Sequence, residues 1–149
     1  MNDPVAILKR DHREVAQMLK TLDASKPGAR RRQTVEKLTH ALELHMEIEE
    51  RDIYPTVERV VGKEDAEEAT IEHGLVREGL ADLRRLVDEP GFGAAVAMIT
   101  AGIRHHVKEE EQEVFPELKK KIDRDELREL GDRVAAAKKT KRSTRRVAA

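Results

Sequence analysis

The sequence contains no cysteine, which excludes disulfides, thiol catalysis, iron–sulfur clusters and zinc sites with cysteine ligands. Only 2% of its 149 residues are aromatic, too few for a β-sandwich core or an aromatic ligand pocket. Apolar runs stay well short of the roughly 18 residues that a membrane-spanning helix needs. The N-terminal segment has no long apolar run and no small-residue cleavage site, so we expect a cytoplasmic protein. Because cysteine is absent, any metal site must use nitrogen and oxygen ligands.

Charge is abundant but unevenly placed. Charged residues make up 40% of the chain and hydrophobic residues 38%, a balance typical of soluble helical proteins with narrow apolar stripes. Six of the 29 Lys and Arg residues lie after residue 137, so the other 23 share the body with all 30 Asp and Glu residues. An acidic body argues against a nucleic-acid-binding core. We expect residues 138–149 to be a disordered basic tail, whose deletion leaves any metal site intact; contact with nucleic acid or an acidic partner is the alternative.

Apolar residues recur at steps of three and four, which predicts helices. Four long helices are expected over about 4–23, 30–54, 64–88 and 94–116, and a shorter one over 123–139. Asp3 followed by Pro4 is a typical helix start, and Pro55 should kink or end the second helix. Short loops between long helices favour an all-α, up-down-up-down antiparallel four-helix bundle, here a single domain over residues 1–137.

The two halves of the chain repeat with an offset of 61 positions. The repeat pairs His12 with His73, His45 with His106, Glu49 with Glu110, Tyr54 with Phe115 and Pro55 with Pro116. Each half therefore has a histidine, a second histidine 33 positions later, a glutamate four positions further, and then an aromatic-proline pair. This pattern predicts two related helical hairpins packed about a pseudo-two-fold axis.

Six of the repeated residues are polar, yet they lie on the apolar faces of the predicted helices. A lone histidine in such a place is usually a satisfied core residue, and a lone glutamate usually turns to solvent. Two unpaired buried carboxylates would cost on the order of several kcal/mol each, and no lysine or arginine lies nearby on these faces. The repeated set therefore predicts a metal site with the ligands His12, His45, Glu49, His73, His106 and Glu110.

Four imidazoles and two carboxylates suit two metal ions about 3.5–4 Å apart, bridged by the carboxylates, with two imidazoles on each ion. Iron fits this mixed set of nitrogen and oxygen donors better than zinc or manganese does. His40 and His105 lie off the apolar faces and are expected at the surface. The neighbouring acidic residues are expected to form a solvated face, with Glu111 the alternative as a substitute ligand or a partner of one; they are Glu47, Glu50, Glu109, Glu111 and Glu113.

The segments 45–50 and 106–111, each followed by an aromatic-proline pair, resemble the hemerythrin-like HHE cation-binding family, particularly its small actinobacterial members. The isolated His12 and His73 complete that family's pattern, which covers about residues 3–120. The resemblance implies an oxo- or hydroxo-bridged non-haem di-iron centre. Oxygen-carrying hemerythrins have a further histidine where this chain has Arg77, and their last carboxylate lies five residues after its histidine rather than four. We therefore expect a more symmetric site with more open coordination positions.

Tyr54 is the only tyrosine and a candidate further ligand, because a phenolate is a hard oxygen donor that suits ferric iron. It lies five residues after Glu49, where Pro55 should distort the helix and turn the ring inward. The alternative is a ring that only packs in the core, as Phe115 would in the other half, since an ideal helix points Tyr54 away from His45.

Open positions on two redox-active ions favour chemistry on small oxidants. The family includes members linked to peroxide and nitric oxide detoxification, and the leading hypothesis is catalase-like decomposition of hydrogen peroxide, with or without nitric oxide scavenging. The alternative is reversible O2 binding, or sensing of iron or oxygen, without turnover. The expected partners are these small molecules, not membranes.

Overall fold

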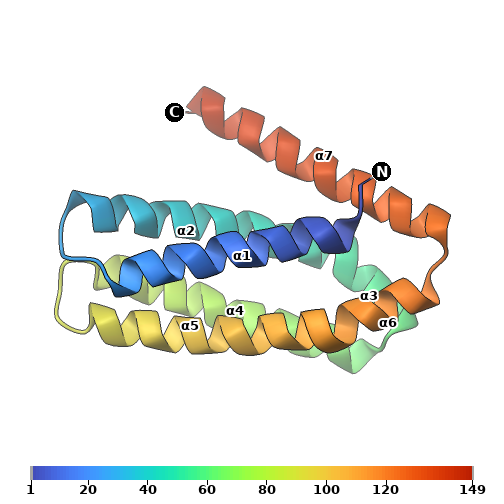
Figure 1. Ribbon diagram of the computed structural model, residues 1–149, viewed down its shortest axis with the longest axis horizontal. Coiled ribbons are helices and arrows are strands. Elements are labelled where there is room, and N and C mark those ends of the chain that lie inside the picture. The colour runs from blue at the N-terminus through green and yellow to red at the C-terminus, as the bar shows by residue number, and fades with distance from the viewer. Residues whose placement is uncertain (1, 149) are drawn as a thin grey trace.

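The computed structural model describes the backbone of residues 2–148 and the side chains of residues 2–140, and all regular structure in this part is helical. Four long helices form an antiparallel bundle (Figure 1): α1 (Pro4–Asp23), α2 (Ala29–Ile48), α4 (Lys63–Arg85) and α5 (Phe92–Glu109). Two short helices, α3 (Tyr54–Val60) and α6 (Phe115–Lys121), continue α2 and α5, and α7 (Arg124–Ala148) crosses the outside of the bundle. The predicted bundle with an extra C-terminal helix is confirmed. None of the described helices is long and apolar enough to cross a membrane.

Local chemistry explains where the helices begin. Asp3 caps α1, its Oδ1 accepting a hydrogen bond of 2.9 Å from the Val5 amide, and Pro4 occupies the first turn, where its missing N–H costs nothing. Gly91 precedes α5 with φ of 96°, in the left-handed region that glycine enters without strain. The turns between helices are short, so consecutive helices run antiparallel as neighbours.

The prolines distort their helices without ending them, which is one of the two outcomes expected for Pro55. A π-helix, η1 (Glu49–Ile53), joins α2 to α3, and a second, η2 (Glu110–Val114), joins α5 to α6. Proline has no N–H to donate to the carbonyl four residues earlier. Just before each proline the helix therefore widens by one residue, and the Tyr54 and Phe115 amides donate to the Glu49 and Glu110 carbonyls, five residues back. In the first half this widening brings the Tyr54 hydroxyl within 3.2 Å of Glu49, five residues before it.

Two apolar clusters fill the bundle, one toward each end. The first includes Leu22, Leu38, Leu83 and Phe92, and the second includes Leu8, Ile48, Ile53, Phe115 and Leu118, all nearly inaccessible to solvent. The repeated histidines and glutamates lie between these two clusters, so close-packed hydrocarbon separates them from water on both sides.

The last helix runs past its predicted end at residue 139. Leu130 and Val134 are fully buried against the bundle, and the following alanine, lysine and arginine residues are strong helix formers. Gly131 permits the close approach of the N-terminus, because a Cβ there would lie 1.8 Å from the carbonyl oxygen of Asn2. Lys138 belongs to the packed part of this helix, not to a tail. The predicted disorder of the later residues stays a prediction, since side chains after residue 140 lie outside the described residues.

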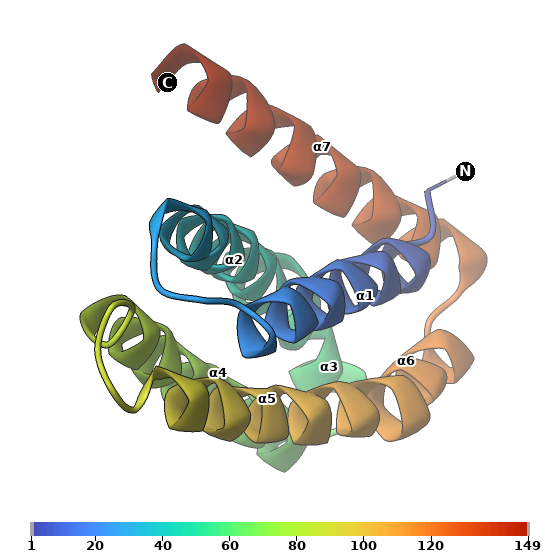
Figure 2. The same ribbon diagram turned by 60° about the vertical axis from the view of Figure 1, so that its left-hand side comes forward.

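Seen from the side in Figure 2, α7 packs across the start of α1 and then diverges from the bundle toward its C-terminal end.

Candidate metal centre

The structure brings the six predicted ligands together in the middle of the bundle, and all six are buried. The side chain of Glu49 is 0% exposed and that of His73 1%. One group of ligand atoms lying within 4.8 Å of one another comes from His12, His45, Glu49 and Glu110, and a second from Glu49, His73 and His106. We call the pair His12 and His45 the first subsite and the pair His73 and His106 the second subsite.

Each glutamate reaches one histidine of each subsite. Glu49 Oε1 lies 3.1 Å from His45 Nε2 and 3.2 Å from His73 Nε2. Glu110 Oε1 lies 3.3 Å from the Nε2 atoms of both His12 and His106. A carboxylate between donors of two subsites is the arrangement that a bridging ligand of two cations requires.

Several of these buried polar atoms have no hydrogen-bond partner among the described residues. They are His12 Nε2, His45 Nε2, Glu49 Oε2 and Glu110 Oε1. Each buried atom left unpaired costs about 1–3 kcal/mol. Nitrogen and carboxylate donors that converge without partners are satisfied by a cation between them, so the residues present fit a metal centre.

The other ring nitrogen, Nδ1, of each of the four candidate ligand histidines is held by a carboxylate. The Nδ1 atom lies 2.7 Å from Glu111 in His12, 2.9 Å from Asp11 in His45, 2.7 Å from Glu50 in His73 and 2.7 Å from Glu72 in His106. An imidazole that donates its Nδ1–H to a carboxylate presents the lone pair of Nε2 to the centre. These four contacts therefore fix both the orientation and the tautomer that metal ligation needs.

Two of these carboxylates correct the sequence interpretation. Glu50 and Glu111 were expected on a solvated face, with a partner of a ligand as the alternative for Glu111. Each is only about 30% exposed and points across to a histidine of a neighbouring helix, so the alternative holds for Glu111 and the expectation for Glu50 was wrong. Asp11 and Glu72 were missed altogether. A signal was available, because each directly precedes or follows a ligand and the 61-residue offset pairs Asp11 with Glu72 and Glu50 with Glu111.

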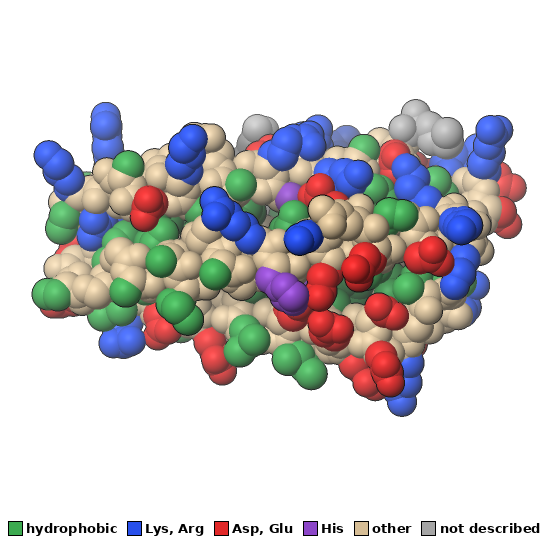
Figure 3. Space-filling model, turned by 60° about the horizontal axis from the view of Figure 1, so that its bottom comes forward, with side chains coloured by type: hydrophobic (Ala, Val, Ile, Leu, Met, Phe, Trp, Pro, Cys, Tyr) green, Lys and Arg blue, Asp and Glu red, His purple; other side chains and the backbone are tan. Residues whose placement is uncertain are grey.

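The two histidines assigned to the surface are indeed exposed. His105 nevertheless contacts Glu72 at 3.3 Å and Glu109 at 3.1 Å. Figure 3 shows a face of the molecule on which a histidine and many acidic side chains lie together at the surface. Since Glu72 also accepts from His106, the contact of His105 with Glu72 reaches the second subsite only through a shared carboxylate.

The hydroxyl oxygen of Tyr54 lies inside the second subsite. It is 2.8 Å from Glu110 Oε2, 3.0 Å from His73 Nε2, 3.2 Å from Glu49 Oε1 and 3.4 Å from His106 Nε2. Burial, and then the negative charges of Glu49 and Glu110, raise the pKa of this phenol, so it keeps its proton while no cation is bound. The π-helix makes the placement possible, and in the first subsite Phe115 stacks on His12 instead, with ring centroids 6.2 Å apart.

Protons take the place of metal charge when the cluster is metal-free. Burial opposes the charged form of His45, but the nearby charge of Glu49 and the hydrogen bond to Asp11 raise its pKa to about 10. For His106, burial is likewise outweighed by the close carboxylates of Glu110 and Glu49, which raise its pKa to about 12. Burial would raise the pKa of Glu49, yet the surrounding histidines hold it well below its ordinary value. Bound cations would displace the protons from Nε2.

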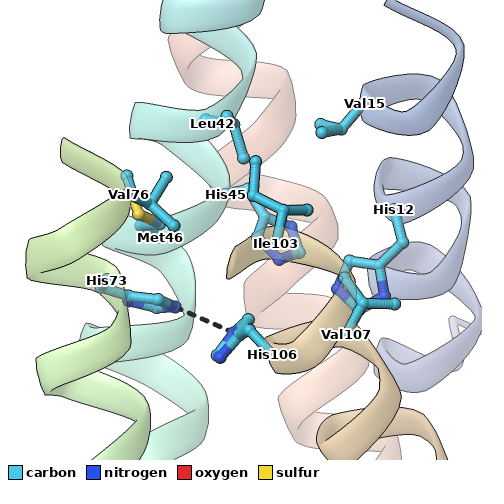
Figure 4. A pocket seen from close by; sticks show the side chains of 10 residues that line it. All are labelled: His12, Val15, Leu42, His45, Met46, His73, Val76, Ile103, His106 and Val107. Atoms are coloured by element: carbon cyan, nitrogen blue, oxygen red, sulfur yellow. Dashed lines mark hydrogen bonds between the residues drawn. The ribbon is translucent and has the colours of Figure 1, made fainter. Parts of the chain in front are cut away.

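A small cavity of about 20 Å³ lies beside the four imidazoles (Figure 4). Its other walls are apolar: Val15, Leu42, Met46, Val76, Ile103 and Val107. All ten lining residues form five pairs at the 61-residue offset, so the cavity lies on the pseudo-two-fold axis, between the subsites. Its volume is close to that of one water molecule, which limits any guest to very small molecules.

A surface groove between α1 and α5, of about 910 Å³, leads toward this cavity. His12, Ile103 and Val107 line both spaces, so these three side chains separate the cavity from solvent. The groove also carries four cationic side chains, Arg13, Lys20, Arg104 and Lys108.

Four helices that each supply a histidine, with two carboxylates between them, define a helical-bundle protein with a cation site in its core. Residues 3–118 match the family model described as the hemerythrin HHE cation binding domain, and the chain belongs to that family. The fold is similar to the crystal structure of a hemerythrin HHE cation binding domain-containing protein, the Rv2633c homolog from Mycobacterium kansasii, with a TM-score of 0.83 and 26% sequence identity. That match covers 97% of this chain and 89% of the other. No curated protein matches the sequence.

Proposed function

We propose that this protein holds two iron ions and uses them to decompose hydrogen peroxide, a catalase-like activity, and to scavenge nitric oxide. One observation carries the proposal: each of two buried glutamates spans both pairs of histidines, next to a cavity that admits only very small molecules. The proposed ligands are His12, His45, Glu49, His73, His106 and Glu110, with Tyr54 as a further ligand of the second subsite.

Two iron ions with shared carboxylates would exchange two electrons together. The balance is that of disproportionation: one H2O2 takes up two electrons and two protons to give two H2O, and a second releases the same electrons and protons as it becomes O2. Nitric oxide is small and carries no charge, so it could also enter the apolar cavity.

The residues of the chain supply orientation, exclusion of bulk water and a place for a proton. The carboxylates behind each imidazole hold the Nε2 atoms toward the centre. The apolar walls, such as Leu42 and Ile103, keep larger reductants away from the cavity. In the metal-free protein the hydroxyl of Tyr54 donates toward Glu110 Oε2 and so holds a proton at the edge of the second subsite, which it would release on binding iron.

The test is oxygen evolution from hydrogen peroxide by the iron-loaded protein, followed with an oxygen electrode. The wild-type chain should evolve O2, while Glu49→Gln should lose both iron and activity. Glu113→Gln removes an equal charge from the exposed side of η2 and should behave as wild type. An iron-loaded wild-type chain that evolves no more O2 than Glu49→Gln would rule out the peroxide activity.

The apolar lining of the cavity favours a second candidate, reversible O2 binding without turnover, because nonpolar walls suit a neutral diatomic guest. Ferrous protein exposed to O2 would then show a new visible spectrum that disappears under argon. Irreversible oxidation on first exposure excludes this role and leaves the redox activity.

A further inference from the structure

The C-terminal helix is connected to a candidate ligand by a short chain of contacts. The Lys138 ammonium of α7 forms an ion pair with Oδ1 of Asp11, and Oδ2 of the same carboxylate lies 2.9 Å from Nδ1 of His45. The three side chains are largely buried: Lys138 is 14% exposed, Asp11 8% and His45 4%. A lysine some 90 residues downstream thus supports a histidine of the first subsite.

This support breaks the two-fold symmetry of the site. The counterpart of Asp11 in the other half is Glu72, whose further contact is the exposed His105. Glu50 pairs with Arg77, which is 36% exposed, and Glu111 contacts only His12 among the described residues. Among the described carboxylates that hold a candidate ligand, Asp11 alone is paired with a largely buried cation.

A buried carboxylate that binds partners from two other helices has little freedom to rotate. Without Lys138, Asp11 would keep a single partner, and its second oxygen would be buried without a donor. Replacing a residue that hydrogen-bonds to a metal ligand typically lowers metal affinity by about 10–100-fold, because that residue orients the imidazole. The contact is therefore positioned to act on His45 and not on the second subsite.

We propose that Lys138 is a positioning residue of the first subsite, acting through Asp11 on His45, so that α7 makes the two metal positions unequal. The role in metal binding rests on the proposed two-ion centre. Deletion of residues 138–149 would then disturb the first subsite, contrary to the expectation from sequence.

The experiment compares the wild type with Lys138→Met, which keeps the aliphatic stem and removes the charge, using NMR of protein labelled with ¹⁵N-histidine. Metal-free and zinc-loaded samples are both measured, zinc serving as a diamagnetic probe. In Lys138→Met the His45 Nδ1–H should exchange with solvent faster than in the wild type, while the Nδ1–H signals of the other three buried histidines stay unchanged.

Lys139→Met is the matched control, since it removes the same charge from an exposed neighbour and should leave all four signals unchanged. Lys138→Arg keeps the cation and should restore the protection of His45. Adding Lys138→Met to Asp11→Asn should change the His45 signal no further, because the lysine acts through the carboxylate.

Unchanged His45 exchange in folded Lys138→Met, or equal acceleration of all four signals, would overturn the proposal. If Lys138→Met does not fold, the Lys138→Arg and Asp11→Asn variants decide the question. The proposal is overturned if the His45 Nδ1–H exchanges fast in Lys138→Arg, or if it exchanges slowly in Asp11→Asn. A wild-type chain that takes up neither zinc nor iron would defeat the two-ion centre, yet the metal-free comparison would still test the contact.

Discussion

The hydroxyl oxygen of Tyr54 lies 2.8 Å from Oε2 of Glu110, so the only tyrosine of the first hairpin reaches across the pseudo-two-fold axis to a glutamate of the second. The π-helix before Pro55 creates this contact. Phe115, in the matching place, leaves the first subsite without a phenol. The set of candidate donor atoms is therefore symmetric in its histidines and glutamates and asymmetric in this one oxygen.

Tyr54→Phe tests whether the phenol ligates iron. Bound ferric iron would displace the phenol proton, since a nearby metal charge stabilises the phenolate, and wild-type protein should then show a purple or blue charge-transfer band. The variant should lose this band and keep its iron, because the six other ligands remain. Absorption spectra at matched iron content decide the question.

Phe115→Tyr is the matched variant for that spectrum. It offers a phenol to the first subsite, where the Phe115 ring now stacks on His12. Combined with Tyr54→Phe, it should restore a visible band. A band that persists in Tyr54→Phe alone shows that the tyrosine only packs in the core.

Glu111→Gln tests the carboxylates behind the histidines. The amide keeps the size of the side chain but removes the negative charge of the carboxylate that accepts a hydrogen bond from His12 Nδ1. The metal affinity of the first subsite should therefore fall about 10-fold or more. Chelator titration should release one ion early in the variant. Glu113 is exposed on the same π-helix, so Glu113→Gln should release its metal ions at the same chelator concentrations as the wild type. Early release from both Glu111→Gln and Glu113→Gln would show a general charge effect.

The stability of the metal-free protein should depend on pH in a defined direction. The folded-state pKa values of His45 and His106, about 10 and about 12, lie above the unfolded value near 6.5. Their contribution is therefore fully present below about pH 6.5 and is lost as pH rises, toward 10 for His45 and toward 12 for His106. The metal-free protein should be less stable at pH 9 than at pH 6.5, by on the order of a few kcal/mol.

Denaturant unfolding in the presence of a chelator measures this effect. Iron-loaded protein is the control, because its histidines bind metal instead of protons and should lack the alkaline loss. Metal-free protein that is equally stable at pH 6.5 and pH 9 would show that these histidines carry no extra protons.

Val107 should control entry to the cavity, since it lies between the cavity and the α1–α5 groove. Val107→Ala should speed the binding of nitric oxide to the iron-loaded protein in stopped-flow measurements, at a cost of about 1 kcal/mol in stability. Met46, its repeat counterpart, lines the cavity but not the groove. Met46→Ala should cost about 2–3 kcal/mol and leave the entry rate unchanged; equal acceleration by both variants would place the entrance elsewhere.

Much of the candidate site could be predicted because its residue pattern is repeated in the two halves of the sequence. His12 and His73, like Glu49 and Glu110, are polar residues on apolar helical faces, and this conflict with burial is visible without coordinates. The four-helix bundle follows from the same periodicity.

What sequence reasoning missed depends on helix distortion and on contacts between distant elements. An ideal helix turns Tyr54 away from the centre, and only the π-helix returns it. The roles of Glu50 and Asp11 depend on which neighbouring helix each side chain reaches across the bundle. Lys138 was assigned to a tail by its charge, because its partner Asp11 lies near the other end of the chain.

The most direct test of the central claim is the number of metal ions that the folded chain binds. Iron analysis of the purified protein after anaerobic reconstitution should give two ions per chain, in keeping with the two buried groups of converging candidate ligands. Replacement of His73 by alanine should lower that number, while replacement of the exposed His40 should not. A correctly folded wild-type chain that binds no iron and no other divalent metal would contradict the account.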